Sequence, residues 1–201
     1  MLLVHALETI SMMLDGLRVA VLATDGYETS ELTEPTRALH EAGASTTLIS
    51  NHEGTIKGKT DADLAAVDLT LDGANPDDYD ALLLPGGAKN PDTLRQDERA
   101  VRFVRAIHDA GKPIAAICHA PWMLVEADVV RGRRVTSYPS LKTDIRNAGG
   151  EWVDEEVVVD RGIVTSRTPE DIPAFNAMML EEFAEGIHEG RVATPTSRGT
   201  N

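Results

Sequence analysis

The sequence predicts an α/β domain in which helices cover both faces of a mostly parallel sheet. Short apolar runs that fit buried strands alternate along the chain with segments of helical periodicity. Aromatic residues make up only 4% of the 201 residues, whereas 42% are hydrophobic, so the core is expected to consist mainly of aliphatic side chains. Such a core suits parallel strands that helices cover.

The first predicted elements form a strand–helix–strand unit. The apolar run 17–23 is followed by polar turn residues, as expected for a buried strand that leads into a loop. Leu32 and Leu39 then fall on one face of a helix, and Gly43 is its expected stop. Residues 46–50 (TTLIS) read as the next strand, which completes a βαβ unit.

The middle of the chain is predicted to continue this alternation. Residues 51–76 hold turn residues and short apolar pieces, which indicate a small excursion of strands. The run 81–84 (ALLL) is the next buried strand, and a glycine pair follows it closely. A single helix is then expected over 92–110, before a strand at 113–117 (PIAAI).

The last third of the chain is predicted to hold three helices and three strands. The helices are expected over 122–127, 141–148 and 169–185. The strands are expected near Val135 and as a pair formed by 151–153 (EWV) and 157–167 (VVVDRGIVTSR).

The predicted domain spans 17–187, between two terminal segments. Residues 1–16 are apolar in places, but they lack a basic start and a cleavage site, and Glu8 interrupts them. We therefore expect neither a signal peptide nor a membrane span there, and interpret the segment as an N-terminal extension or the product of an upstream start codon. Residues 188–201 are rich in Thr, Pro, Ser and Gly and are expected to form a disordered tail.

Charge and cysteine content exclude several classes of function. The formal net charge of −14 repels nucleic acid and anionic membranes, so neither is an expected partner. A single cysteine cannot form a disulfide within the chain, which predicts a reducing, cytoplasmic compartment. No CxxC or HExxH motif offers metal-ligand spacing, and GxGxxG is absent, so we expect no metal and no other cofactor.

The only cysteine, Cys118, is predicted to be an exposed nucleophile on the turn from strand 113–117 into a helix. Backbone dipoles at a helix N-terminus favour the thiolate over the thiol. A buried structural cysteine is the alternative, because free cysteines are often buried. The position of Cys118 directly after an apolar strand and before His119 favours the nucleophile. His119 can accept the thiol proton, or it can serve only as a supporting hydrogen-bonding group.

Two further loops are expected beside Cys118, because ligands bind at the carboxyl ends of parallel strands. Glu28 and Glu31 follow the first strand, and one of them can cap the helix while the other reaches the site. A carboxyl group beside a thiolate is tolerated if it stays protonated, which predicts a raised pKa. The N–H groups of Gly87 and His119 are candidates for an oxyanion hole, although a glycine pair also fits a plain turn.

The chain resembles the PfpI family of intracellular cysteine peptidases and general stress proteins. This family belongs to the class I glutamine amidotransferase-like superfamily, which includes the parkinsonism-associated protein deglycase. The resemblance covers about residues 17–185 and lies in four segments: YETSELTEP, LLLPGGAKNPDTLR, GKPIAAICHAPWMLVEADVVRGRRVTSY and TSRTPED. It implies a flavodoxin-like three-layer sandwich with Cys118 as the nucleophile.

The resemblance also implies roles for the residues around this cysteine. His119 matches its catalytic partner, and Glu31 matches a glutamate that hydrogen-bonds the cysteine. Glu28 matches a second acidic position, and Tyr138 matches a tyrosine near the active site. Asp92 matches a carboxylate that a neighbouring subunit contributes in peptidase members, which implies a homodimer or a larger oligomer.

Two functional hypotheses follow. The first is a stress-response hydrolase that acts on peptides or on glycated or dicarbonyl-modified groups through Cys118. The second is a non-enzymatic sensor or chaperone that works through oxidation of Cys118. Glutaminase activity is not expected, because threonine occupies the histidine position of the H-P-E motif in Thr168-Pro169-Glu170. The natural substrate, whether a small molecule or a peptide, does not follow from the sequence.

Overall fold

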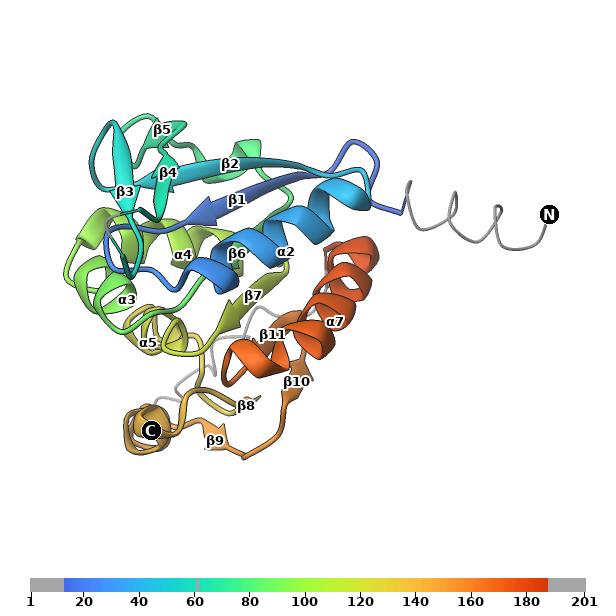
Figure 1. Cartoon of the computed structure of the whole chain (residues 1–201). Helices are drawn as coiled ribbons and strands as arrows, with labels where there is room; N and C mark the ends of the chain where they lie inside the picture. The colour runs from blue at the N-terminus through green and yellow to red at the C-terminus, as the bar shows by residue number, and fades with distance from the viewer. Residues whose placement is uncertain (1–12, 61, 188–201) are drawn as a thin grey trace, which may run out of the picture.

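A computed structural model describes residues 13–60 and 62–187 and shows an α/β sandwich (Figure 1). Neighbouring strands of its main sheet are parallel, except β10 and β11, which are antiparallel. This confirms the predicted mostly parallel sheet. In spatial order the seven strands are β10 (Val157–Asp160), β11 (Ile163–Ser166), β7 (Ile114–Ile117), β6 (Ala81–Leu84), β1 (Arg18–Leu22), β2 (Ser45–Ser50) and β5 (Leu69–Thr70).

Helices cover both faces of this sheet (Figure 1). In β1, Val19 and Val21 point into one buried cluster, and Ala20 and Leu22 point into the other, as the alternation of side chains in a strand requires. The first cluster includes residues of α2 (Thr29–Glu41) and α7 (Ile172–Glu185). The second includes residues of α3 (Lys89–Leu94), α4 (Glu98–Asp109) and α5 (Pro121–Glu126).

Smaller elements lie at the ends of the sandwich. Strands β3 (Thr55–Lys57) and β4 (Leu64–Ala66) pair antiparallel, within the predicted excursion of strands. Strands β8 (Arg134–Val135) and β9 (Glu151–Trp152) pair in parallel, with α6 (Lys142–Asn147) packed beside β9. The remaining elements are short 3-10 turns at Pro76–Asp78, Pro139–Leu141 and Pro169–Asp171.

The single helix predicted over 92–110 is wrong. The structure contains two helices, α3 and α4, with a break at Asp97. The Asp97 side chain accepts a hydrogen bond of 2.9 Å from the backbone amide of Arg99 and so caps the start of α4. An aspartate N-cap competes with helix continuation, because its side chain replaces a backbone acceptor.

The predicted pairing of 151–153 with a continuous strand over 157–167 is also wrong. The backbone turns at Arg161 and Gly162, both at positive φ, and divides this run into the hairpin β10–β11. Strand β9 pairs with β8 instead.

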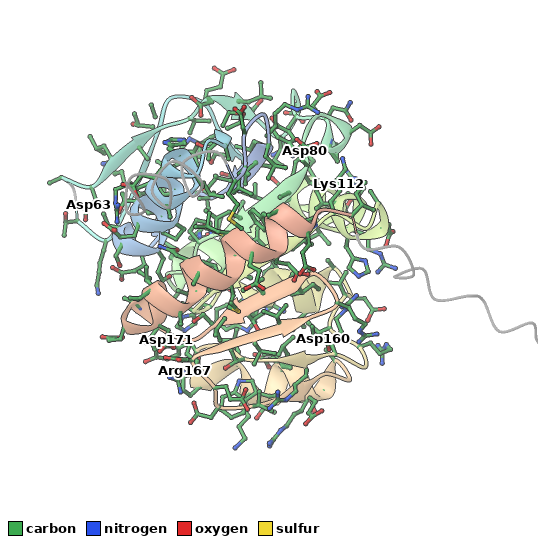
Figure 2. The ribbon with its side chains drawn as sticks, turned by 90° about the vertical axis from the view of Figure 1, so that its right-hand side faces the viewer. Asp63, Asp80, Lys112, Asp160, Arg167 and Asp171 are labelled. Atoms are coloured by element: carbon green, nitrogen blue, oxygen red, sulfur yellow. The ribbon has the colours of Figure 1, made fainter. Side chains whose placement is uncertain are left out.

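Helix α7 lies across the β10–β11 hairpin, and Arg167 and Asp171 lie beside each other near the start of this helix (Figure 2). Arg167 donates hydrogen bonds of 2.9 and 3.0 Å to the Asp171 carboxylate, which closes the loop between β11 and α7.

The structure describes the two predicted terminal segments only in part. Of the predicted extension 1–16, residues 13–16 are described, and Leu14 is buried in the cluster beneath α2 and α7. The rest of that extension and the predicted tail 188–201 lie outside the described residues. No helix in the described parts of the chain is long and apolar enough to cross a membrane.

Candidate active site

Cys118 lies at the turn between β7 and α5, where the sequence predicts it. Its φ of 64° is in the left-handed region, which costs a non-glycine residue about 1 kcal/mol or more. Two backbone hydrogen bonds hold the turn: the Cys118 amide donates to the carbonyl of Ser166 at 3.0 Å, and its carbonyl accepts from the amide of Tyr138 at 2.8 Å. The predicted exposure is wrong, because Cys118 is only 7% exposed.

His119 lies beside the thiol in a position to accept its proton. Its Nδ1 is 3.1 Å from the sulfur of Cys118. The imidazole stacks on the Tyr138 ring, with centroids 4.4 Å apart and planes 22° apart. Partial burial lowers the pKa of His119, so the neutral ring predominates at neutral pH. In the tautomer that leaves Nδ1 free, Nε2 can donate to the hydroxyl of Ser140 at 3.4 Å.

Glu31 is the raised-pKa carboxylic acid that the sequence predicts for this site. The residue is fully buried, and burial is the main cause that raises its pKa to about 7. The negative charge of Glu28 adds to the rise, while the Cys118 thiol and the amides of Gly86 and Gly87 oppose it. Among the described residues, no group satisfies either oxygen at full hydrogen-bonding geometry.

Glu28 lies at the N-cap position of α2, but its side chain does not cap the helix. The carboxylate instead lies 3.4 Å from the ammonium of Lys59. Lys59 lies between β3 and β4, and no local sequence pattern places it near Cys118. The structure thus separates the two glutamates: Glu31 faces the thiol, and Glu28 lies at the rim with a cationic partner.

The glycine pair after β6 packs directly against the cysteine. A Cβ atom on Gly86 would lie 2.3 Å from Oε2 of Glu31 and 2.6 Å from Cβ of Cys118, so only glycine fits there. Gly87 has φ +82°, and a Cβ on it would lie 2.4 Å from the carbonyl oxygen of Gly26. This turn therefore lets the backbone approach the sulfur closely.

The electrostatic balance at the sulfur differs from the sequence prediction. The backbone amides of Gly87 and His119 hydrogen-bond the sulfur and lower the pKa of the Cys118 thiol. Burial and the negative charge of Glu31 outweigh them and raise this pKa well above its usual range. The thiolate expected from the helix N-terminus is thus disfavoured at rest, because the site is shielded from water.

These groups share one cavity of about 430 Å³. Asp92 does not line it and is exposed on α3, so the structure brings together all the predicted site residues except this one. No group of three or more His, Cys, Asp or Glu side chains that could hold a metal ion occurs within the described residues. The cavity is lined by Gly26, Tyr27, Glu28, Glu31, Lys59, Gly87, Ala88, Cys118, His119, Tyr138, Thr168, Pro169 and Glu170.

Comparisons with known proteins show which sequences and structures this chain is similar to. The DJ-1/PfpI family matches residues 17–182. The chain is 47% identical over 165 residues to Protein/nucleic acid deglycase 2 of Escherichia coli, covering 81% of this chain and 95% of that protein. It is 48% identical over 167 residues to General stress protein 18 of Bacillus subtilis, covering 82% and 96%. The crystal structure of Drosophila melanogaster DJ-1beta superposes with a TM-score of 0.77 at 30% identity, covering 84% of this chain and 90% of that one.

Proposed function

Because the chain belongs to the DJ-1/PfpI family, we propose that it is a cysteine hydrolase. Its substrates are either groups that carry glycation or dicarbonyl adducts, which it removes, or peptides, which it cleaves. The observation that carries the proposal is the 3.1 Å approach of the Cys118 sulfur to Nδ1 of a neutral His119, inside a cavity. A thiol beside a neutral imidazole is a nucleophile with its base already in place. The name deglycase of an Escherichia coli relative supports an adduct as the substrate.

The geometry suggests how the first step proceeds. A carbonyl carbon of the substrate lies against the sulfur, and a C–S bond forms while the thiol proton passes to Nδ1 of His119. The carbonyl oxygen gains the negative charge and faces the amides of Gly87 and His119, which serve as the oxyanion hole. In its acid form, which predominates below about pH 7, Glu31 donates a hydrogen bond toward the sulfur and adds no negative charge to the site. Tyr138 holds the imidazole in place by stacking.

The proposal includes a homodimer or larger oligomer. Asp92 is exposed on α3, where a second subunit can bring it to the imidazole of His119. A carboxylate in this place would orient the ring and stabilise it when it is protonated. The reaction also needs a reduced Cys118, which fits the reducing cytoplasm predicted from the single cysteine.

Turnover assays test the proposal. We expect wild-type protein to hydrolyse a methylglyoxal adduct of N-acetylarginine or a fluorogenic peptide over many cycles. Cys118→Ala should abolish turnover, and His119→Ala should reduce kcat by about a hundredfold or more. His40→Ala is the matched control, because His40 is exposed on α2 and does not line the cavity. Equal rates for wild type and Cys118→Ala would refute the proposal.

The same assay separates the enzyme from an oxidation sensor. The buried, hydrogen-bonded thiol and the general stress protein among the relatives keep the sensor as the second candidate. Peroxide that oxidises Cys118 stoichiometrically, in a protein that never turns over either substrate, would favour the sensor. Turnover beyond one equivalent would favour the enzyme.

A further inference from the structure

A second cavity adjoins the active-site cavity, and lysines line it. Its volume is about 660 Å³, and Gly26 and Lys59 line both cavities. Lys57, Lys59 and Lys89 all border the second cavity. The sequence contains only five lysines, and three of them lie around this one cavity.

Backbone contacts fix the segments that carry these lysines. The Gly26 amide donates to the carbonyl of Lys57 at 2.7 Å, and the Lys57 amide donates to Oδ1 of Asp25 at 2.8 Å. A Cβ atom on Gly26 would lie 2.6 Å from Cβ of Lys89, so the start of α3 packs tightly on the loop after β1. The lysines are therefore held beside one another by chain segments that are distant in sequence.

Among the described residues that line this cavity, lysines outnumber carboxylates. Asp25 is the only carboxylate among its described lining residues, and its two oxygens already face the Lys57 amide and, at 3.6 Å, Nε2 of His52. Lys59 lies 3.4 Å from the Glu28 carboxylate, and the Asp63 carboxylate accepts hydrogen bonds from Thr60 at the edge of the cavity. Among the described residues no carboxylate lies within ion-pair distance of Lys89. In a chain of net charge −14, an anion finds a favourable local potential here.

We infer that Lys59 and Lys89 form a subsite for an anionic group of the substrate, either a carboxylate or a phosphate. A substrate whose reacting carbonyl lies on Cys118 extends past Gly26 and Lys59 into this cavity. The inference deepens the proposed function, because it names acidic adducts and acidic peptides as the preferred class. It rests on that function for the identity of the substrate, but the recognition of an anion can be measured without turnover.

A pair of alkylating reagents tests the subsite at the cysteine itself. Iodoacetate and iodoacetamide both transfer a small group to sulfur and release iodide, but only iodoacetate carries a negative charge. Cys118 is the only cysteine, so the alkylated mass reports on this site alone. The ratio of the two rate constants cancels any change in the intrinsic reactivity of the thiol, including one that follows from the Lys59–Glu28 contact.

The double variant Lys59→Gln/Lys89→Gln should lower the iodoacetate-to-iodoacetamide ratio by about fivefold, because each exposed charge contributes only a modest interaction. Added KCl should lower the wild-type ratio and leave that of the variant nearly unchanged. The control Arg102→Gln/Arg131→Gln removes the same charge from exposed positions that line neither cavity, and should keep the wild-type ratio. Equal ratios in all three proteins would overturn the inference.

A binding measurement covers the case in which the buried thiol resists both reagents. Acetate and inorganic phosphate are titrated separately while the amide resonances of Gly26 and Gly58 are followed by NMR. Saturable shifts in wild type that vanish in the lysine variant support the subsite, and the stronger of the two ligands shows whether carboxylate or phosphate is preferred. No shift with either ion would overturn it. Shifts in a protein without turnover would support the subsite while the proposed hydrolase fails.

Discussion

The chemistry of this site depends on which of three adjacent groups holds a proton. Burial raises the pKa of Glu31 to about 7 and that of the Cys118 thiol still further, while it lowers that of His119. Just below pH 7, Glu31 and the thiol are therefore both mainly protonated, and the imidazole is the free base among these three groups. Because these groups interact strongly, their titrations belong to the cluster rather than to single residues. The proposed mechanism therefore generates the nucleophile during attack, when the thiol proton moves to His119.

The raised pKa of Glu31 predicts a specific dependence of stability on pH. Its pKa is higher in the folded than in the unfolded state, so its favourable contribution is complete below about pH 4.5 and is lost as the pH rises toward 7. The shift from 4.5 to about 7 corresponds to about 3 kcal/mol. Glu31→Gln should remove this loss. The free energy of unfolding of the variant, relative to that of wild type, should therefore increase between pH 4.5 and 7. Urea unfolding at a series of pH values measures it.

The control for this prediction is Glu34→Gln on the same helix. Glu34 is exposed and pairs with Arg37 at the surface, so its replacement should leave the pH dependence of unfolding nearly as in wild type. If Glu31→Gln and wild type lost stability in parallel between pH 4.5 and 7, Glu31 would be ionised at no cost in the folded protein. The hydrogen bond that the proposal assigns to its acid form would then be wrong.

At the scale of elements, the sequence predicted most strands and helices because their burial follows from local pattern. The runs in β6 and β7 are fully buried, and short apolar runs identify such strands well. The failures occurred where one polar side chain or one turn decides the outcome. Asp97 divides α3 from α4 although hydrophobic periodicity continues on both sides of it. The turn at Arg161 and Gly162 divides an otherwise continuous β pattern.

The turn between β6 and α3 is predicted to tolerate no side chain at its first glycine. Gly86→Ala places a methyl group within 2.3 to 2.7 Å of Glu31, Cys118 and Ile117, where the elbow and the buried carboxyl leave no space. We expect a loss of about 1–3 kcal/mol in the free energy of unfolding, together with a fall in turnover. Gly132→Ala is the control: its φ is +67° but no atom lies within 4 Å, so only backbone strain of about 1 kcal/mol applies. Equal stability losses would show that packing at Gly86 is unimportant.

At the scale of the whole molecule, the sequence anticipated which loops meet but not how deeply they bury the site. The carboxyl ends of β1, β6 and β7 bring Glu31, Gly87 and Cys118 together, which follows from a parallel sheet. The burial of Cys118 results from the close packing of Gly86 and Glu31 on it, which no local pattern encodes. Ser140 and Lys59 were missed for the same reason, since only the tertiary fold places them beside His119 and Glu28.

The role proposed for Asp92 predicts that catalytic sites are assembled between subunits. Asp92 is exposed on α3 and does not line the cavity of its own chain, whereas Cys118 is buried within it. If a partner supplies the carboxylate, Cys118→Ala and Asp92→Ala should each be nearly inactive alone. Each mixed dimer then holds one site with an intact cysteine and an intact aspartate, so co-refolding the two variants in equal amounts should restore about a quarter of wild-type activity.

Two controls make this complementation decisive. Co-refolding Cys118→Ala with His119→Ala should restore nothing, because both residues belong to the same chain's site and no mixed dimer unites them. Sedimentation of each variant checks that oligomers form, since a variant that remains monomeric would fail for another reason. Full activity of Asp92→Ala alone would remove this carboxylate from the mechanism. Full activity in a strictly monomeric wild-type protein would show that each chain completes its own site, and Tyr138, Trp122 and Ser140 of the same chain would then orient His119.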